Sequence, residues 1–209
     1  DGMENNISGV IMYDETLRQS TTCSDKTPFV DLLSNKNVLP GIKVDTGAKD
    51  LAGAPGEKIT EGLDGLRDRL NEYYSIGARF AKWRAVITIG DKIPSEHCIV
   101  ANANALARYA SLCQEANIVP IVEPEVLMDG SHTIDACYDV TNKTLDCVFD
   151  VLDTHNVMLE GIVLKPNMVI SGLNCSEQAD VDTVSQMTVK TLKSNVPDTV
   201  PGIAFLSGG

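Results

Sequence analysis

The sequence predicts an α/β protein of the (β/α)8 or TIM-barrel class, with about six of the eight β/α units present. Short runs rich in Ile and Val recur along the 209 residues, and amphipathic segments separate most of them. The runs follow one another at roughly 40 residues, the length of one strand, one helix and their loops. A regular period without a central break favours a barrel over an open, doubly wound sheet.

Each element follows from this alternation. The predicted strands cover residues 7–13, 41–45, 79–86, 119–125, 159–165 and 201–207. The predicted helices cover residues 60–74, 95–114, 133–153 and 182–193, and Ser95 is a candidate N-cap for the second of them. A closed barrel needs eight strands and about 250 residues. We therefore expect residues 1–209 to form a single, incomplete barrel domain.

Charge and composition exclude several classes of function. Seventeen Lys and Arg against 29 Asp and Glu give a net charge of −12, which disfavours binding to nucleic acid or to anionic membranes. No apolar stretch is long enough to span a membrane, and no signal peptide is visible, so we expect a cytoplasmic protein. Six cysteines and three histidines show no metal-ligand spacing, so we expect reduced thiols, no metal and no cofactor.

Charged residues recur late in four consecutive predicted strands. They are Lys43 and Asp45, Lys82 and Arg84, Glu123 and Glu125, and, alone on the fourth strand, Lys165. Residues two apart share a face of a strand, and the alternate positions are apolar and must pack on helices. Any one of these residues alone would be read as a solvated strand end. Together they predict an inward-facing active site at the carboxyl ends of the strands.

The residue types suggest lysine chemistry. Lys165 follows an apolar run and precedes Pro166, and Lys82 is expected nearby. Apolar surroundings and a neighbouring cation both lower the pKa of an amine, as a nucleophile that attacks a carbonyl requires. Glu123 and Glu125 are candidates for proton transfer. The run 207–209 (Ser-Gly-Gly) follows the last predicted strand and either cradles a phosphate through its N–H groups or forms a simple turn.

Motifs along nearly the whole chain resemble class I fructose-bisphosphate aldolase. These motifs are Gly-Val-Ile-Met-Tyr-Asp-Glu-Thr-Leu (9–17), Gly-Ile-Lys-Val-Asp (41–45), Glu-Gly-Leu-Asp-Gly-Leu (61–66), Phe-Ala-Lys-Trp-Arg (80–84), Leu-Ala-Arg-Tyr-Ala-Ser (106–111), Val-Pro-Ile-Val-Glu-Pro-Glu (119–125), Leu-Lys-Pro-Asn-Met-Val (164–169) and Phe-Leu-Ser-Gly-Gly (205–209). Their order and length make coincidence an inadequate explanation.

The resemblance implies reversible, metal-independent cleavage of fructose 1,6-bisphosphate to dihydroxyacetone phosphate and glyceraldehyde 3-phosphate through a lysine imine. By this resemblance, Lys165 matches the imine-forming lysine and Glu123 the main general acid and base, while Glu125 matches the neighbour that helps hold the lysine and the carbinolamine steps. Lys82 matches the cation beside the imine, and Arg84 and Lys43 match cations around the substrate. The loop that binds the ketose 1-phosphate is matched by Ser207, Gly208 and Gly209.

The same resemblance implies further properties of a full-length protein. It is expected to be a homotetramer with a small sugar phosphate as substrate, and binding to the cytoskeleton is a further expectation. The family's first barrel strand, with a catalytic aspartate, and its last strand, with a phosphate-binding arginine, have no counterpart in these 209 residues. We therefore expect the 209 residues alone to be poorly stable and nearly inactive.

Two alternatives remain beside this interpretation. One is a non-catalytic, aldolase-like scaffolding protein, which the loss of Lys165 or Glu123 would have favoured. The other is a lysine-imine aldolase for a different sugar phosphate, against which the motifs at 81–84 and 122–125 argue.

Overall fold

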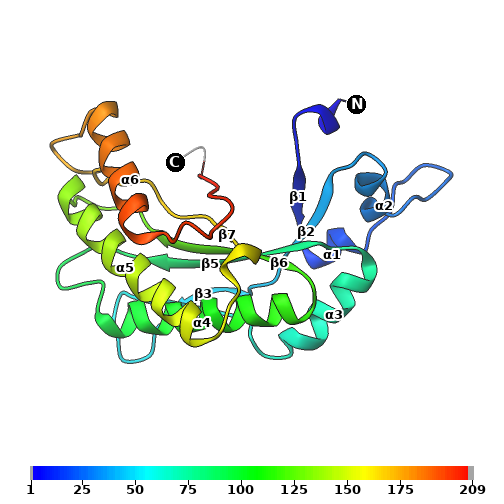
Figure 1. Cartoon of the computed structure of the whole chain (residues 1–209), viewed down its shortest axis with the longest axis horizontal. Coiled ribbons are helices and arrows are strands. Elements are labelled where there is room, and N and C mark those ends of the chain that lie inside the picture. Colours follow the sequence, from blue (N-terminus) through cyan, green and yellow to red (C-terminus); the bar gives the residue numbers. More distant parts are fainter. Residues whose placement is uncertain (1, 207–209) are drawn as a thin grey trace.

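The computed structural model describes residues 2–206 as a curved parallel sheet with helices packed along it and a separate two-stranded hairpin (Figure 1). The strands are β1 (Gly9–Met12), β2 (Leu39–Lys43), β3 (Gly47–Asp50), β4 (Lys58–Glu61), β5 (Phe80–Ile87), β6 (Val119–Val126) and β7 (Val163–Leu164). The helices are α1 (Asp14–Leu17), α2 (Phe29–Ser34), α3 (Leu66–Ile76), α4 (Glu96–Glu115), α5 (Ile134–Thr154) and α6 (Val181–Asn195), with 3-10 turns η1 (Met3–Asn5) and η2 (Leu159–Gly161).

The main sheet has the order β1-β2-β5-β6-β7, and every neighbouring pair is parallel. Strands that follow one another in the sheet are joined by helical crossovers, which parallel pairing requires. The predicted α/β class with a parallel sheet is therefore confirmed. Residues 2–206 form an open sheet and not a closed barrel, as the six predicted units also implied.

The last two predicted strands are shorter than expected. The run 159–165 contains the turn η2 and only the two-residue β7, because a 3-10 turn occupies its first half. In the described part of the run 201–207, residues 201–206, Ile203 alone makes a parallel bridge, to Leu164. The hydrogen bonds from Leu164 N to Gly202 O (3.1 Å) and from Ala204 N to Leu164 O (2.8 Å) still set this segment beside β7. The predicted order is thus kept, while the extent of regular strand was wrong.

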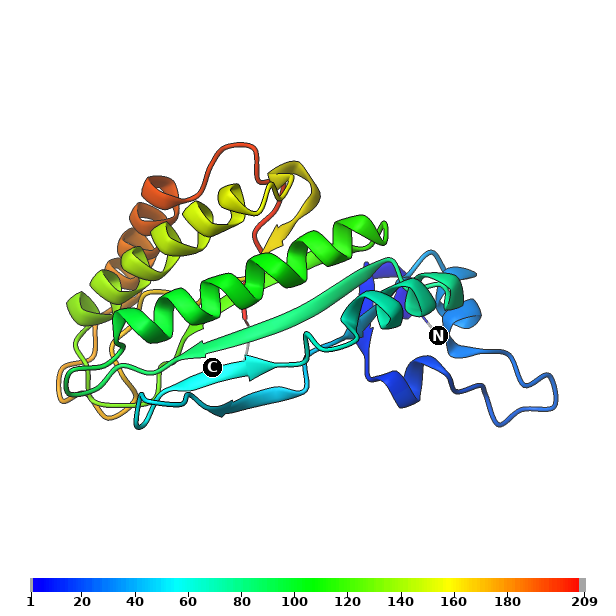
Figure 2. The ribbon, with the colours of Figure 1, turned by 90° about the horizontal axis from the view of Figure 1, so that it is seen from below.

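The predicted helix over residues 60–74 was wrong in its first part. Residues 58–61 form β4, which pairs with β3 as an antiparallel hairpin that was not predicted. Gly62 and Gly65 have φ values of 126° and 63°, which favour glycine, so the helix begins only at Leu66. The hairpin lies beside β5 (Figure 2), where Thr60 Oγ1 donates a hydrogen bond to Arg84 O at 2.6 Å.

The other three predicted helices are confirmed to within two residues at each end. Their N-caps explain where they begin. Ser95 Oγ accepts from Cys98 N at 3.1 Å, Thr133 Oγ1 from Ala136 N at 3.2 Å, and Asp180 Oδ1 from Thr183 N at 2.8 Å. None of the helices in residues 2–206 combines the length and apolarity needed to cross a bilayer.

One face of the sheet forms the core with the helices. Along β5, buried and partly exposed residues alternate, so that Ala81, Trp83 and Ala85 are all buried. The Trp83 ring stacks on Tyr109 of α4 at a centroid separation of 5.5 Å. Burial of this large apolar surface stabilises the fold, although Trp83 Nε1 has no hydrogen-bond partner among the described residues. Because β5 alternates, this packing turns Lys82 and Arg84 to the opposite face.

Candidate active site

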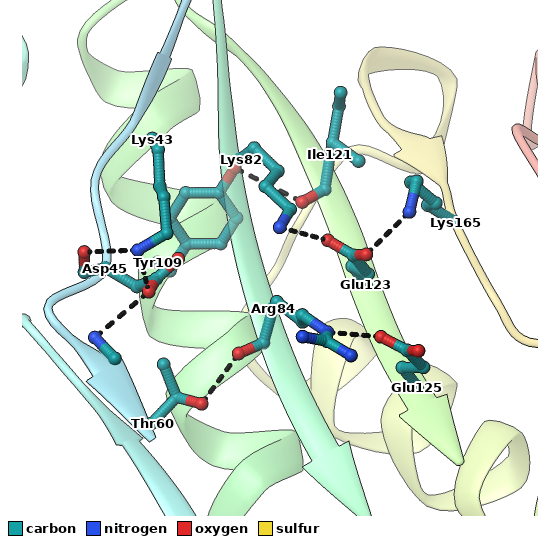
Figure 3. Close-up of polar contacts among 11 residues, drawn as sticks. Lys43, Asp45, Thr60, Lys82, Arg84, Tyr109, Ile121, Glu123, Glu125 and Lys165 are labelled. Atoms are coloured by element: carbon teal, nitrogen blue, oxygen red, sulfur yellow. Dashed lines mark hydrogen bonds and ion pairs between the residues drawn. The ribbon is translucent and has the colours of Figure 1, made fainter. Parts of the chain in front are cut away.

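Ionic side chains from four neighbouring strands meet on the face of the sheet opposite the helices (Figure 3). They are Lys43 at the end of β2 and Asp45 two residues after it, Lys82 and Arg84 on β5, Glu123 and Glu125 on β6, and Lys165 directly after β7. All seven belong to the predicted set. They converge because the strands are parallel and all present their carboxyl ends at one edge.

Glu123 is the centre of this group. Its side chain is 2% exposed, and Figure 3 shows Lys82 and Lys165 approaching its carboxylate from opposite sides. Lys165 Nζ lies 2.6 Å from Oε1, and Lys82 Nζ lies 3.0 Å from Oε2. One buried carboxylate therefore faces two ammonium groups, an arrangement that holds both lysines in fixed positions and provides a proton acceptor for either.

The surroundings of Lys165 differ from the predicted apolar ones. Lys82 is nearby, as expected, but both lysines share Glu123, so the environment of Lys165 is ionic. Before Lys165 Nζ can attack a carbonyl it must lose a proton, and Glu123 Oε1 is in hydrogen-bond contact to receive it.

Lys43 and Asp45 form a second pair. Lys43 Nζ donates to Asp45 Oδ1 at 2.5 Å and to Asp45 O at 3.0 Å, while Gly47 N donates to the same Oδ1 at 3.1 Å. Asp45 Oδ2 is buried without a hydrogen-bond partner among the described residues. Asp45 therefore fixes Lys43 to the turn that leads into the hairpin.

Arg84 and Glu125 form the third pair, through a short contact between Arg84 Nε and Glu125 Oε2. The Glu125 carboxylate raises the pKa of the Arg84 guanidinium above its usual value, although partial burial opposes this. Arg84 therefore remains a cation at any working pH, with the other guanidinium nitrogens available for a ligand.

Five of the seven ionic residues line a cavity of about 510 Å³: Lys43, Asp45, Lys82, Arg84 and Lys165. Its volume is within the usual range for small-molecule sites. The four cations outnumber the three carboxylates of the cluster, and this local excess of positive charge in a protein of charge −12 favours an anionic ligand.

Tyr13 also lines the cavity and was not predicted as a site residue. Lys43 Nζ lies 5.8 Å from the centre of its ring. The signal in the sequence was its position directly after the first apolar run, the place where the other strands carry their polar residues. The predicted phosphate loop, Ser207, Gly208 and Gly209, lies outside the described residues.

In residues 2–206, no cluster of three His, Cys, Asp or Glu side chains is arranged to hold a metal ion. The site consists of amines, a guanidinium and carboxylates. A parallel β/α sheet that carries such a set at the carboxyl ends of its strands is typical of the β/α-barrel enzymes.

Comparison with known proteins defines the family. The model of the family described as glycolytic, class-I fructose-bisphosphate aldolase matches residues 1–209. A probable fructose-bisphosphate aldolase class 1 of Xanthomonas axonopodis pv. citri is 61% identical over 203 residues, which are 97% of this chain and 60% of that protein. The cytosolic fructose-bisphosphate aldolase 6 of Arabidopsis thaliana is 55% identical over 205 residues, 97% of this chain and 56% of that protein.

The fold agrees with this assignment. The Plasmodium falciparum fructose-bisphosphate aldolase, solved with TRAP and a small-molecule inhibitor, superposes with a TM-score of 0.95 at 48% identity and covers 100% of this chain and 60% of its own. The chain belongs to the class I fructose-bisphosphate aldolase family. It spans about 60% of the length of the relatives that it matches.

Proposed function

We propose that the full-length protein reversibly cleaves fructose 1,6-bisphosphate to dihydroxyacetone phosphate and glyceraldehyde 3-phosphate through an imine on Lys165. The observation that carries this proposal is the contact of Lys165 Nζ with the buried Glu123 carboxylate at the edge of a cation-lined cavity. Membership of the class I aldolase family supports the same chemistry.

The proposed steps use the paired groups in order. Lys165 Nζ, after losing a proton to Glu123, attacks the ketose C2 carbonyl to form a carbinolamine. Glu123 then returns that proton to the carbinolamine hydroxyl, which leaves as water, so that a protonated imine and a free Glu123 carboxylate remain. Glu123 takes the proton of the C4 hydroxyl as the C3–C4 bond breaks. The bonding electrons move into the imine, so that an enamine forms instead of a bare carbanion and the aldehyde leaves. Protonation of the enamine at C3 and hydrolysis then release dihydroxyacetone phosphate and free Lys165.

The remaining cluster residues have proposed roles that follow from their pairing. Lys82, on the second oxygen of Glu123, stabilises that carboxylate when Lys165 becomes part of the imine. Glu125 holds Arg84 in place and assists the carbinolamine steps. Arg84 and Lys43 bind the substrate's anionic groups. Ser207, Gly208 and Gly209 bind the ketose 1-phosphate.

Borohydride reduction of the full-length protein with dihydroxyacetone phosphate, followed by peptide mapping, tests the imine. We expect a stable adduct on Lys165. Lys165→Ala should abolish it, while Lys82→Ala should still give an adduct on Lys165, at a reduced rate. The second variant is the informative control because Lys82 contacts the same carboxylate. An adduct that moves to Lys82, or none in the wild-type protein, would contradict the proposal.

The state of the full-length protein forms part of the same proposal. We propose a homotetramer in the cytosol, in line with the cytosolic naming of the plant relatives, and test it by sedimentation and fractionation. Binding to cytoskeletal filaments is a further proposal, tested by co-sedimentation. We also propose that residues 1–209 form one domain with little activity alone. A direct comparison of both chains in the cleavage assay tests this.

A further inference from the structure

Asn167 lies two residues after Lys165 and does not line the active-site cavity. The residue is only 9% exposed, and its side chain makes four hydrogen bonds within the protein. A buried amide in a loop beside a proposed nucleophile calls for a physical explanation, because burying an amide costs free energy unless its hydrogen bonds are made.

The explanation begins with the short strand β7. Lys165 N donates to Val122 O of β6 at 2.8 Å, which is the last backbone hydrogen bond between these strands. The next hydrogen bond of this ladder would run from the backbone N of residue 124 to Lys165 O, but Pro124 has no N–H. In the described part of the chain, no backbone hydrogen bond joins residues 166–168 to β6.

Beyond Lys165, the Asn167 side chain makes the hydrogen bond that connects this segment to β6. Its Oδ1 accepts a hydrogen bond from Val126 N of β6 at 3.1 Å. Its Nδ2 donates to Thr141 Oγ1 of α5 at 3.0 Å and to Met168 O at 3.0 Å, with a longer contact to Cys137 Sγ of α5 at 3.9 Å. Val126 N can only donate and Met168 O can only accept, so Asn167 Oδ1 must face Val126 and Nδ2 must face Met168.

The two hydrogen bonds that attach segment 165–167 to β6 lie on either side of Glu123. Val122 and Val126 lie on either side of Glu123 along the strand, so segment 165–167 is tied to β6 both before and after the Glu123 carboxylate. The 2.6 Å contact of Lys165 Nζ with Glu123 Oε1 depends on this placement.

We propose that Asn167 is a positioning residue, whose amide replaces the missing strand pairing and holds Lys165 against Glu123. This inference rests on the proposed function at Lys165. It goes beyond that function by assigning a role in catalysis to a side chain that does not line the cavity.

The test uses the full-length protein with Asn167→Ala and Asn167→Asp. Asn167→Ala removes all four side-chain hydrogen bonds. Asn167→Asp keeps the acceptor for Val126 N but turns a carboxylate oxygen toward Met168 O. For both we expect kcat for fructose 1,6-bisphosphate cleavage to fall on the order of 10- to 100-fold, because misplacing a reacting group has that effect. We expect KM to stay within about threefold, because no cavity-lining side chain is removed.

Asn102→Ala is the matched control. Asn102 is 2% exposed and its Nδ2 donates to Lys58 O at 2.8 Å and Cys98 O at 3.0 Å, so it too is a buried amide that ties two elements together. We expect a similar loss of stability in urea, with kcat within about twofold of the wild-type value.

Borohydride trapping with dihydroxyacetone phosphate separates the possible failures. If the wild-type protein forms the adduct on Lys165 and Asn167→Ala traps it at the same rate, the positioning role is refuted and the proposed function stands. An equal fall in kcat for Asn102→Ala would also refute it, since general loosening of the fold would then suffice. If the wild-type protein forms no adduct, the proposed function and this inference fail together.

Discussion

Replacing Glu123 by Gln is the most direct test of the charge arrangement at the site. The substitution keeps the size and hydrogen-bonding capacity of the side chain but removes its charge. Lys82 and Lys165, whose side chains are 17% and 16% exposed, would then face a neutral amide and each other. We therefore expect the folded protein to lose stability as well as activity.

The magnitude follows from the distances. At an effective dielectric constant of about 20, each Lys–Glu123 contact, at 2.6 and 3.0 Å, contributes about 5 to 6 kcal/mol of Coulomb attraction. Most of this is offset by the cost of removing the charges from water. Breaking a buried pair by removing one partner costs about 3–5 kcal/mol. Because Gln still accepts a hydrogen bond, we expect a decrease of about 3 kcal/mol in the free energy of unfolding.

Urea unfolding of the full-length protein at pH 7 measures this value. Asp50→Asn is the matched control, because Asp50 pairs with Lys58 at 2.5 Å but the two side chains are 89% and 42% exposed. An exposed pair of this kind contributes little to stability, because water screens both charges. Equal losses for the two variants, or a more stable Glu123→Gln protein, would refute the conclusion that Glu123 compensates two partly buried cations.

Three further predictions concern residues outside the ionic cluster. Ser95→Ala should lower the free energy of unfolding by about 1–2 kcal/mol in urea, because Ser95 caps α4 and donates from Oγ to the buried Glu57 carboxylate at 2.5 Å. Burial raises the pKa of the Cys98 thiol to about 11 from its usual 9.0. The thiol therefore contributes to the free energy of unfolding below pH 9, and this contribution is lost as the pH rises toward 11. Cys98→Ala should flatten the dependence of the free energy of unfolding on pH in this range. Gly41→Ala should lower the free energy of unfolding by about 1–3 kcal/mol, because a Cβ there would lie 2.3 Å from the Phe80 ring. In a double-mutant cycle, the Gly41 substitution should be nearly neutral when Phe80→Ala is already present.

Each of these has a clear contrary result. An unchanged unfolding midpoint for Ser95→Ala would mean that water replaces the hydroxyl on both Glu57 and the helix end. If the free energy of unfolding of the Cys98→Ala protein depends on pH between 9 and 11 as that of the wild type does, the loss of stability at alkaline pH comes from other groups. Additive costs for Gly41→Ala and Phe80→Ala would remove the proposed contact between the two positions.

The sequence predicted the face of the sheet on which the site lies. In β5 and β6, charged residues alternate with apolar ones, so the location of Lys82 and Glu123 on a common face follows from strand geometry. Ser95 as an N-cap was likewise predictable, because capping depends on residues within one turn. The β3–β4 hairpin was missed, since its strands are four residues long and half exposed, and they carry little hydrophobic signal.

The sequence by itself determined the parallel α/β class, the order of its units and the seven ionic residues of the site, because these depend on periodicities within single elements. Only the tertiary structure decided that Lys82 and Lys165 share Glu123, that Arg84 pairs with Glu125, and that Asn167 bridges β6 and α5. These partners are 26 to 42 residues apart in the chain. Their pairing depends on strand register and side-chain packing, which no local pattern contains.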